Sequence, residues 1–282
     1  MEKTLIKDKS YGGERPLYAA SNLILENVRI LPGESALKHS SDIEARKCEF
    51  SGKYPFWHSE DIQVSDCVFH EGARAAIWYV KNFRMTDTVV EAPKMFREMD
   101  GLCLRNVKLP NALETCWNCA DVQISDAEID KADYIFMNNR DLKIENLHLN
   151  GNYSFQYVKN AVIRNSVLNT KDAFWHSEGV TVYDSVLNGE YLGWHSHNLR
   201  LVNCKIFGTQ PLCYAHDLVM ENCTLGDDAD LAFEYSTLDA QITGHAVSIK
   251  NPDGGRIRVG SVGEIIIDEN CHHPGKCKIE TE

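Results

Sequence analysis

Apolar and polar residues alternate along this chain in short segments that recur at a nearly constant spacing. Eleven segments begin at positions 22, 42, 61, 82, 101, 121, 141, 160, 179, 198 and 217, which are 19 to 21 residues apart. The second and fourth positions of every segment are apolar, as in Leu23 and Leu25 or Ile62 and Val64. Since alternate residues of a strand face opposite sides, the pattern predicts strands with one buried face.

Two polar positions mark where each repeat turns. The sixth position is Asn or Asp in ten of the eleven repeats, with Lys47 as the exception, and the first is always Asn, Asp or Gly. These residues tolerate the left-handed backbone conformation, so we expect a corner at both positions of every repeat. The seventh and ninth positions turn inward again, as with Val28 and Ile30, and five to seven variable residues form a third corner.

Three short strands and three corners in about 20 residues are typical of one coil of a parallel β-helix. We therefore predict an all-β, single-stranded parallel β-helix of eleven or twelve coils in one domain. Residues 1–21 would be an N-terminal cap and residues 22–236 eleven coils. Residues 237–282 would form an irregular last coil, a hairpin around Gly254 and Gly255, and a C-terminal cap.

Charge and composition restrict the partners and the cellular compartment that we expect for this β-helix. With 29 Lys and Arg against 41 Asp and Glu, the net charge of −12 argues against a nucleic acid partner. No apolar run approaches the roughly 20 residues of a membrane-spanning helix, and the first residues lack the apolar segment of a secretory signal. We expect a cytoplasmic protein without membrane contact, in which the ten cysteines stay reduced.

Several longer motifs resemble one bacterial family. They read YGGERPLY, APKMFRE, PNALETCWNC, KDAFWHSEGVTVYDS, GEYLGWHSHNLRLVNC and LAFEYST. They are similar to segments of the family filed as domain of unknown function 3737, grouped with the pectin-lyase-like β-helices. The resemblance covers nearly the whole chain and implies a right-handed helix. It implies no activity, because superfamily relatives such as pectate lyases are only an analogy for function.

All five tryptophans occupy one outward position, on the strand that follows the variable residues. In successive repeats this Trp column reads Lys38, Trp57, Trp78, Arg97, Trp117, Met137, Gln156, Trp175, Trp194, Cys213 and Glu234. Indole presents a broad apolar face that suits a pyranose ring, so the column predicts a saccharide-binding face. Alternatively, the rings pack on one another or lie beneath a terminal segment.

The next residue of each repeat is always able to form a hydrogen bond. This His/Tyr column reads His39, His58, Tyr79, Glu98, Asn118, Asn138, Tyr157, His176, His195, Tyr214 and Tyr235. Strict alternation would turn it inward as a hydrogen-bonded ladder. If the strand bends here, the column instead lines a groove, with His58, His176 and His195 as ligand-binding groups.

Charged residues gather on three adjacent repeats, namely Arg74, Lys94, Arg97, Glu98, Asp100 and Glu114. Arg74 and Lys94 would bind an anionic group of a ligand. Glu98, Glu114 and Arg97 are the candidate catalytic residues, since a carboxylate pair is typical of saccharide hydrolases. No complete hydrolase or lyase constellation is present, and mutual neutralisation of the charges is an equal alternative.

The cysteines predict packing rather than chemistry. Cys48, Cys67, Cys204 and Cys223 share the seventh position and would form core stacks. Cys116 and Cys119 should face opposite sides of a strand. The run from Cys271 to Cys277 contains zinc-ligand types without a second pair, so we predict no metal and no cofactor.

Two functions of different class follow from these patterns. The first is binding, or modification, of a saccharide on the face that carries the Trp column. The second is a non-catalytic scaffold that uses the same face to contact another protein or a second copy of itself.

Overall fold

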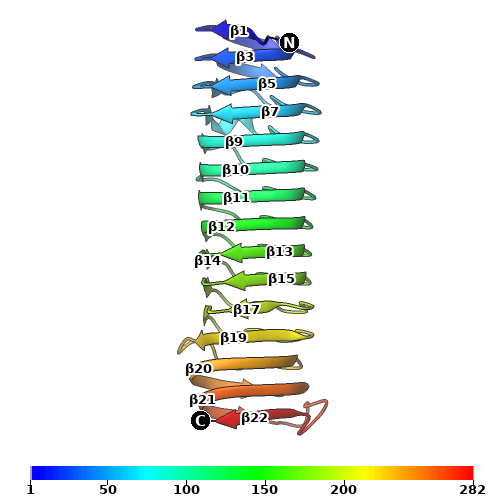
Figure 1. The fold of residues 1–282 in the computed structure, drawn as a ribbon, viewed down its shortest axis with the longest axis vertical. Coiled ribbons are helices and arrows are strands. Elements are labelled where there is room, and N and C mark those ends of the chain that lie inside the picture. The colour runs from blue at the N-terminus through cyan, green and yellow to red at the C-terminus, as the bar shows by residue number, and fades with distance from the viewer. Residues whose placement is uncertain (1, 282) are drawn as a thin grey trace. The chain divides into compact units, whose positions relative to one another are not determined.

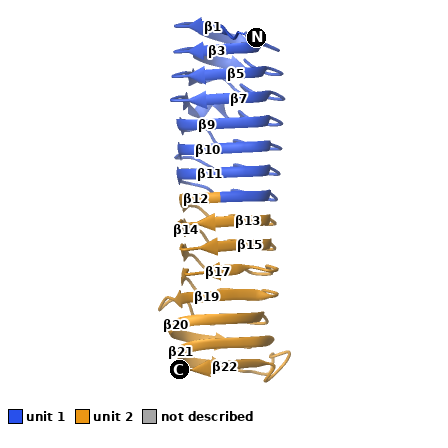
Figure 2. Cartoon of the chain, viewed as in Figure 1, with its two compact units in different colours: residues 1–143 blue, residues 144–282 orange. Residues whose placement is uncertain are grey.

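The computed structural model describes residues 2–281, and nearly all of its regular structure is β-strand (Figure 1). Contacts within the chain define two compact units, residues 1–143 and residues 144–282 (Figure 2). Within residues 2–281, no helix has the length and apolar character needed to span a bilayer.

The first unit is built from strands that pair in parallel with the strand one repeat later. β3 pairs with β1 and β5, and Leu23 lies opposite Ile43. Its elements are β1 (Thr4–Lys7), β2 (Ser10–Glu14), β3 (Ser21–Glu26), β4 (Arg29–Glu34), β5 (Ser41–Arg46), β6 (Glu49–Phe50), β7 (Glu60–Ser65), β8 (Val68–Phe69), the 3-10 helix η1 (Glu71–Ala73), β9 (Lys81–Val90), β10 (Asp100–Leu109), β11 (Ala120–Ile129) and the start of β12 (Arg140–Asn150). A register of one repeat per strand is the signature of a coil.

The second unit follows the same plan. β15 pairs in parallel with β13 and β17, and Val182 lies opposite both Ile163 and Leu201. After the end of β12, its strands are β13 (Lys159–Arg164), β14 (Val167–Asn169), β15 (Glu178–Tyr183), β16 (Val186–Asn188), β17 (Arg200–Val202), β18 (Lys205–Phe207), β19 (Leu218–Leu225), β20 (Thr237–Lys250), β21 (Gly254–Ile266) and β22 (Cys277–Thr281). Each unit is a right-handed parallel β-helix, as predicted.

Backbone angles confirm the first two predicted corners. The first position of all eleven repeats and the sixth position of all eleven have positive φ, including Lys47 at 53°. Side chains in the sixth position also bond from coil to coil. Asn106 donates to Asp87 at 2.6 Å, and Asn203 donates to Asp184 at 2.9 Å. The short amide or carboxylate side chain therefore favours the positive φ of the corner and also links neighbouring coils by hydrogen bonds.

The interior holds the predicted apolar columns. Phe50 and Phe69 stack with ring centroids 4.5 Å apart. The seventh-position cysteines, Cys48 and Cys67 in the first unit and Cys204 and Cys223 in the second, are buried, and each thiol donates to a backbone carbonyl.

One prediction about the cysteines is wrong. Cys116 and Cys119 are both buried rather than facing opposite sides. Asn118 between them has φ of 56°, which bends the chain and breaks the alternation of a regular strand.

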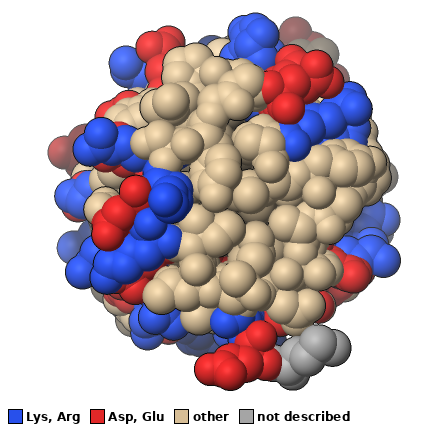
Figure 3. All heavy atoms as spheres, turned by 90° about the horizontal axis from the view of Figure 1, so that it is seen from above, with Lys and Arg blue, Asp and Glu red and all other residues tan. Residues whose placement is uncertain are grey.

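Coils extend to both ends of the described chain. Residues 1–21 were predicted to form an N-terminal cap. Within this range, β1 and β2 pair in parallel with β3 and β4, as the strands of successive coils do. Seen from the end that carries β1, uncharged side chains occupy the middle and charged ones the rim (Figure 3). Leu5 in β1 is 55% exposed.

The hairpin predicted around Gly254 and Gly255 is not formed, because β20 and β21 run parallel. The two glycines begin β21 and lie opposite Thr237 and Leu238. A Cβ at Gly255 would lie 1.9 Å from the carbonyl oxygen of Leu238. The glycine therefore permits close approach of two coils, which the sequence pattern does not distinguish from a hairpin turn.

Candidate functional site

The Trp column of the first unit points outward but does not present free ring faces. Trp57 and Trp78 stack with centroids 5.5 Å apart and an angle of 16° between their planes. The guanidinium of Arg97 lies 4.9 Å from the ring centroid of Trp78 and 4.0 Å from that of Trp117. The faces of these indoles are thus turned toward the neighbouring coil, and a ligand would meet their edges.

Hydrogen bonds hold these indoles in place. The Nε1–H of Trp57 donates to the carbonyl of Ala75 at 2.7 Å, and that of Trp78 donates to the carbonyl of Lys94 at 2.8 Å. Both indoles are half-buried. Because each ring packs against the side chain of the next coil, the Trp column stabilises the packing of successive coils in the first unit.

The charged cluster is largely neutralised by its own members. Glu114 accepts a hydrogen bond from Arg97 at 2.9 Å and pairs with Lys94 at 3.1 Å. Partial burial raises the pKa of Glu114, but the bonds from Lys94 and Arg97 outweigh it, so the pKa lies below its ordinary value. Glu114 is therefore ionised at neutral pH and has no proton to donate.

The other three predicted members, Arg74, Glu98 and Asp100, take no part in these ion pairs. Asp100 is exposed and begins β10. Glu98 accepts a hydrogen bond from Asn118 at 2.6 Å, and Asn118 accepts one from Asn138 at 2.8 Å. Arg74 is exposed and makes no ion pair with any described residue. The structure thus joins Lys94, Arg97 and Glu114 and leaves Glu98 in the His/Tyr column.

The His/Tyr column points outward because the chain bends there. All eleven of its residues have positive φ, including His39 at 60°, His58 at 54° and Tyr79 at 60°. In the first unit these three rings stack, with centroids 5.3 Å and 4.7 Å apart. Partial burial, together with the charges of His39 and Lys38, lowers the pKa of His58, which favours its neutral form.

A groove runs beside these three rings. This corner groove has a volume of about 310 Å³ and is lined by His39, Ser40, Ser41, His58, Ser59, Glu60, Tyr79 and Lys81. Ser40 and Ser59 are buried, with their hydroxyls 3.1 Å apart, and Ser59 donates to the carbonyl of Leu37 at 3.0 Å. The edges of the three rings and the charged side chains of Glu60 and Lys81 thus line the same groove.

The second unit repeats the stacked column. The rings of Tyr157, His176 and His195 lie 5.5 Å and 5.0 Å apart. Trp175 is 36% exposed, whereas Trp194 is half-buried and donates to the carbonyl of Gln210 at 2.9 Å. Partial burial and three neighbouring histidines lower the pKa of His195. His176, His195, Trp175 and Trp194 are therefore brought together, as the columns predict.

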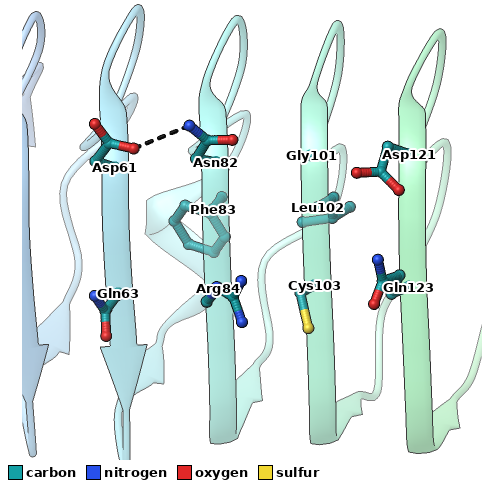
Figure 4. A pocket seen from close by; sticks show the side chains of 10 residues that line it. All are labelled: Asp61, Gln63, Asn82, Phe83, Arg84, Gly101, Leu102, Cys103, Asp121 and Gln123. Atoms are coloured by element: carbon teal, nitrogen blue, oxygen red, sulfur yellow. Dashed lines mark hydrogen bonds between the residues drawn. The ribbon is translucent and has the colours of Figure 1, made fainter.

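A second hollow was not predicted from the sequence. This β10 hollow has a volume of about 350 Å³ and lies on the outer face of β7, β9, β10 and β11 (Figure 4). It is lined by Asp61, Gln63, Asn82, Phe83, Arg84, Gly101, Leu102, Cys103, Asp121 and Gln123. The repeat did contain the signal, since Gly101 and Cys103 place two small residues between longer polar ones.

No metal site is formed within residues 2–281, where no three His, Cys, Asp or Glu side chains are grouped to hold an ion. His272 and His273 both lie beside Asp253, at 3.3 Å and 3.5 Å. The ring of His272 also stacks on Tyr235, with centroids 4.2 Å apart.

The sequence matches a known protein family over nearly its whole length. Residues 4–280 match the model of the family described as protein of unknown function DUF3737. The chain belongs to this family. The resemblance of the quoted motifs is therefore confirmed. No curated protein matches the DUF3737 chain significantly.

Solved structures similar to the DUF3737 chain share little sequence with it. The surface adhesin PfbA of Streptococcus pneumoniae is 8% identical, with a TM-score of 0.39 and coverage of 95% of this chain and 85% of that one. The mannuronan C-5 epimerase AlgE4 A-module of Azotobacter vinelandii is 10% identical, with a TM-score of 0.39 and coverage of 99% and 91%. The periplasmic alginate epimerase AlgG is 10% identical, with a TM-score of 0.37 and coverage of 92% and 76%. Likeness of this degree carries no conclusion about function.

Proposed function

We propose that this DUF3737 chain binds a saccharide in the corner groove of its first unit. The observation that carries the proposal is the stack of His39, His58 and Tyr79 beside a groove whose other residues are polar. Because these rings stack on one another, they offer a ligand their edges. The imidazole nitrogens and the phenol hydroxyl there can bond sugar hydroxyls beside the other polar groups of the groove.

The polar groups of the groove suit a ligand rich in hydroxyls. Ser41 can donate and accept, Glu60 accepts, and Lys81 donates. Neither Glu60 nor Lys81 forms an ion pair with another described residue, so both remain available to a ligand. A neutral oligosaccharide fits this mixture better than a polyanion, which the net charge of −12 would repel.

The proposal is binding without chemical change of the saccharide. A hydrolase needs one carboxylic acid that can give up a proton near a second carboxylate. Glu114 is held ionised by two cations, and Glu98 is engaged by Asn118. The candidate catalytic residues therefore act as structural ion pairs and hydrogen bonds.

Titration calorimetry of the full chain against a panel of neutral oligosaccharides tests this function. We expect one class of glycan to bind, and both His58→Ala and Tyr79→Ala to weaken binding at least about tenfold, or about 1.4 kcal/mol. His70→Ala is the matched control, because His70 lies beside Glu49 and Glu91 and does not line the groove.

The proposal fails if no glycan in the panel binds, or if the two groove variants bind as well as the His70 control. Binding that depends on Trp175 alone would also contradict it, because that indole belongs to the second unit.

A further inference from the structure

The outer face of the first unit carries two rows of side chains across β7, β9, β10 and β11. One row contains Asp61, Asn82, Gly101 and Asp121, and the other contains Gln63, Arg84, Cys103 and Gln123 (Figure 4). Strand register places the second row on adjacent positions. Both rows face solvent, over the buried side chains of Phe83 and Leu102.

The hollow exists because β10 contributes two small residues to these rows. Gly101 has no side chain, and Cys103 has a short one, whereas Arg84 on β9 and Gln123 on β11 extend further from the sheet. A Cβ at Gly101 would lie 3.1 Å from the Oδ1 of Asn82, and the φ of +79° also favours glycine. Space for a small molecule is thereby left above the middle of β10.

Opposite charges without partners lie on the two sides of this space. Within residues 2–281, Arg84 forms no ion pair, and neither does Asp121. On the neighbouring strands β10 and β11, by contrast, Lys108 and Glu128 form an ion pair at 2.8 Å. Two strand spacings and two residues along the strand separate the Cα atoms of Arg84 and Asp121 by about 12 Å. In Figure 4 the carboxylate of Asp121 points toward β10, and the side chain of Arg84 lies over the outer face of β9.

We propose that the β10 hollow binds a small zwitterion of the amino-acid class. The guanidinium of Arg84 pairs with its carboxylate, a geometry that favours two parallel hydrogen bonds. The carboxylate of Asp121 pairs with its ammonium group, and the amides of Gln63 and Gln123 bond the remaining polar atoms. A simple anion would meet the charges of Asp61 and Asp121, and a simple cation would meet that of Arg84.

Cys103 provides a reporter inside the hollow. It is half-buried, as are Cys271 and Cys277, whereas the other seven cysteines are buried. The experiment measures alkylation of each thiol by iodoacetamide in the full chain, by mass spectrometry, in the presence of single amino acids. We expect one group of amino acids to slow alkylation of Cys103 at least about fivefold without changing the rates of Cys271 and Cys277.

Matched ligands and variants separate the proposed contacts. Two analogues of the protecting amino acid serve as matched ligands: the amine that lacks its carboxylate, and the carboxylic acid that lacks its ammonium group. Neither should protect Cys103. Arg84→Gln and Asp121→Asn should remove the protection. Arg105→Gln should retain it, because Arg105 is an exposed residue of β10 that does not line the hollow. Far-UV circular dichroism confirms that each variant is folded.

The assignment is overturned if no amino acid protects Cys103, or if all three thiols are protected equally. Protection that survives both Arg84→Gln and Asp121→Asn also overturns it, as does equal protection by the acid alone.

Discussion

Single residues at the corners determine how each coil turns. Asn and Asp fill the sixth position because they adopt positive φ at lower cost than most residues and bond to the next coil. Lys47, at 53°, shows that the fold imposes the angle even without a short polar side chain. The corners at the first and sixth positions of the repeat could therefore be predicted from the sequence.

The bend at the His/Tyr column was left open by the sequence, because tyrosine and glutamate are not typical of positive φ. Asn118 and Asn138 in the same column were the available signal. The outward position of His58 follows from that bend, and with it the groove.

Replacing a corner asparagine tests its conformational role. Asn106 has φ of 50° and donates to Asp87. We expect Asn106→Val to lower the free energy of unfolding by about 2 kcal/mol, because a β-branched residue strains this conformation and the bond is lost. Asn106→Gly should cost less, and Lys108→Val on the same strand should cost less than about 1 kcal/mol. Urea unfolding measures all three, and equal losses for Asn106→Val and Lys108→Val would contradict the account.

The pKa of His58 predicts a pH dependence of stability. Burial and the charges of His39 and Lys38 lower this pKa in the folded chain, so the unfolded chain binds the proton more readily. Stability should therefore fall as pH drops through the ordinary histidine range near about 6.5. His58→Tyr should reduce the fall in Tm between about pH 7.5 and about pH 5.5 and leave the slope above about pH 8 unchanged. An unchanged slope at low pH would refute the assignment.

Columns of side chains are the elements that tie one coil to the next. The sequence showed that the tryptophans share one outward column, but it did not show how their rings are oriented. That orientation depends on residues one repeat away, such as Arg97 between Trp78 and Trp117, and on carbonyls in the variable corner. The β10 hollow was missed for a similar reason. It depends on two small residues of β10 that lie between longer side chains of the adjacent strands.

Removing the central cation of the Trp column tests its bracing role. Arg97→Ala should lower the free energy of unfolding of the first unit by about 2 kcal/mol, because two cation–π contacts and the bond to Glu114 are lost. It should also increase acrylamide quenching of tryptophan fluorescence. Arg105→Ala is the control, as an exposed arginine outside the column. Equal unfolding energies for the two variants would show that the column does not brace the coils.

At the scale of the whole molecule, each of the two units is an array of similar coils, so the length of a unit should be adjustable by whole repeats. Within the first unit, β10 lies between β9 and β11 and pairs with both in the same register. The stability of such an array is approximately a sum of coil and neighbour terms. The repeat period therefore predicted the architecture well, while the irregular C-terminal segment was misread at its glycines.

Deleting one coil tests this modular account. Removal of residues 101–120 joins β9 to β11 in register, so we expect a folded β-helix with a lower urea midpoint. Removal of residues 101–110 alone shifts the inward columns and should prevent native folding. Far-UV circular dichroism and size-exclusion chromatography distinguish these outcomes. Equal behaviour of the two deletions would contradict the modular account.

Imidazole resonances of the full chain provide the most direct test of the saccharide groove. The chain has 11 histidines, and ¹⁵N labelling with single-histidine variants assigns the rings of His39, His58 and His70. During titration with the glycan that binds, the resonances of His39 and His58 should shift together and saturate, while that of His70 stays in place. Saturable glycan binding that leaves His39 and His58 unshifted would contradict the proposed site.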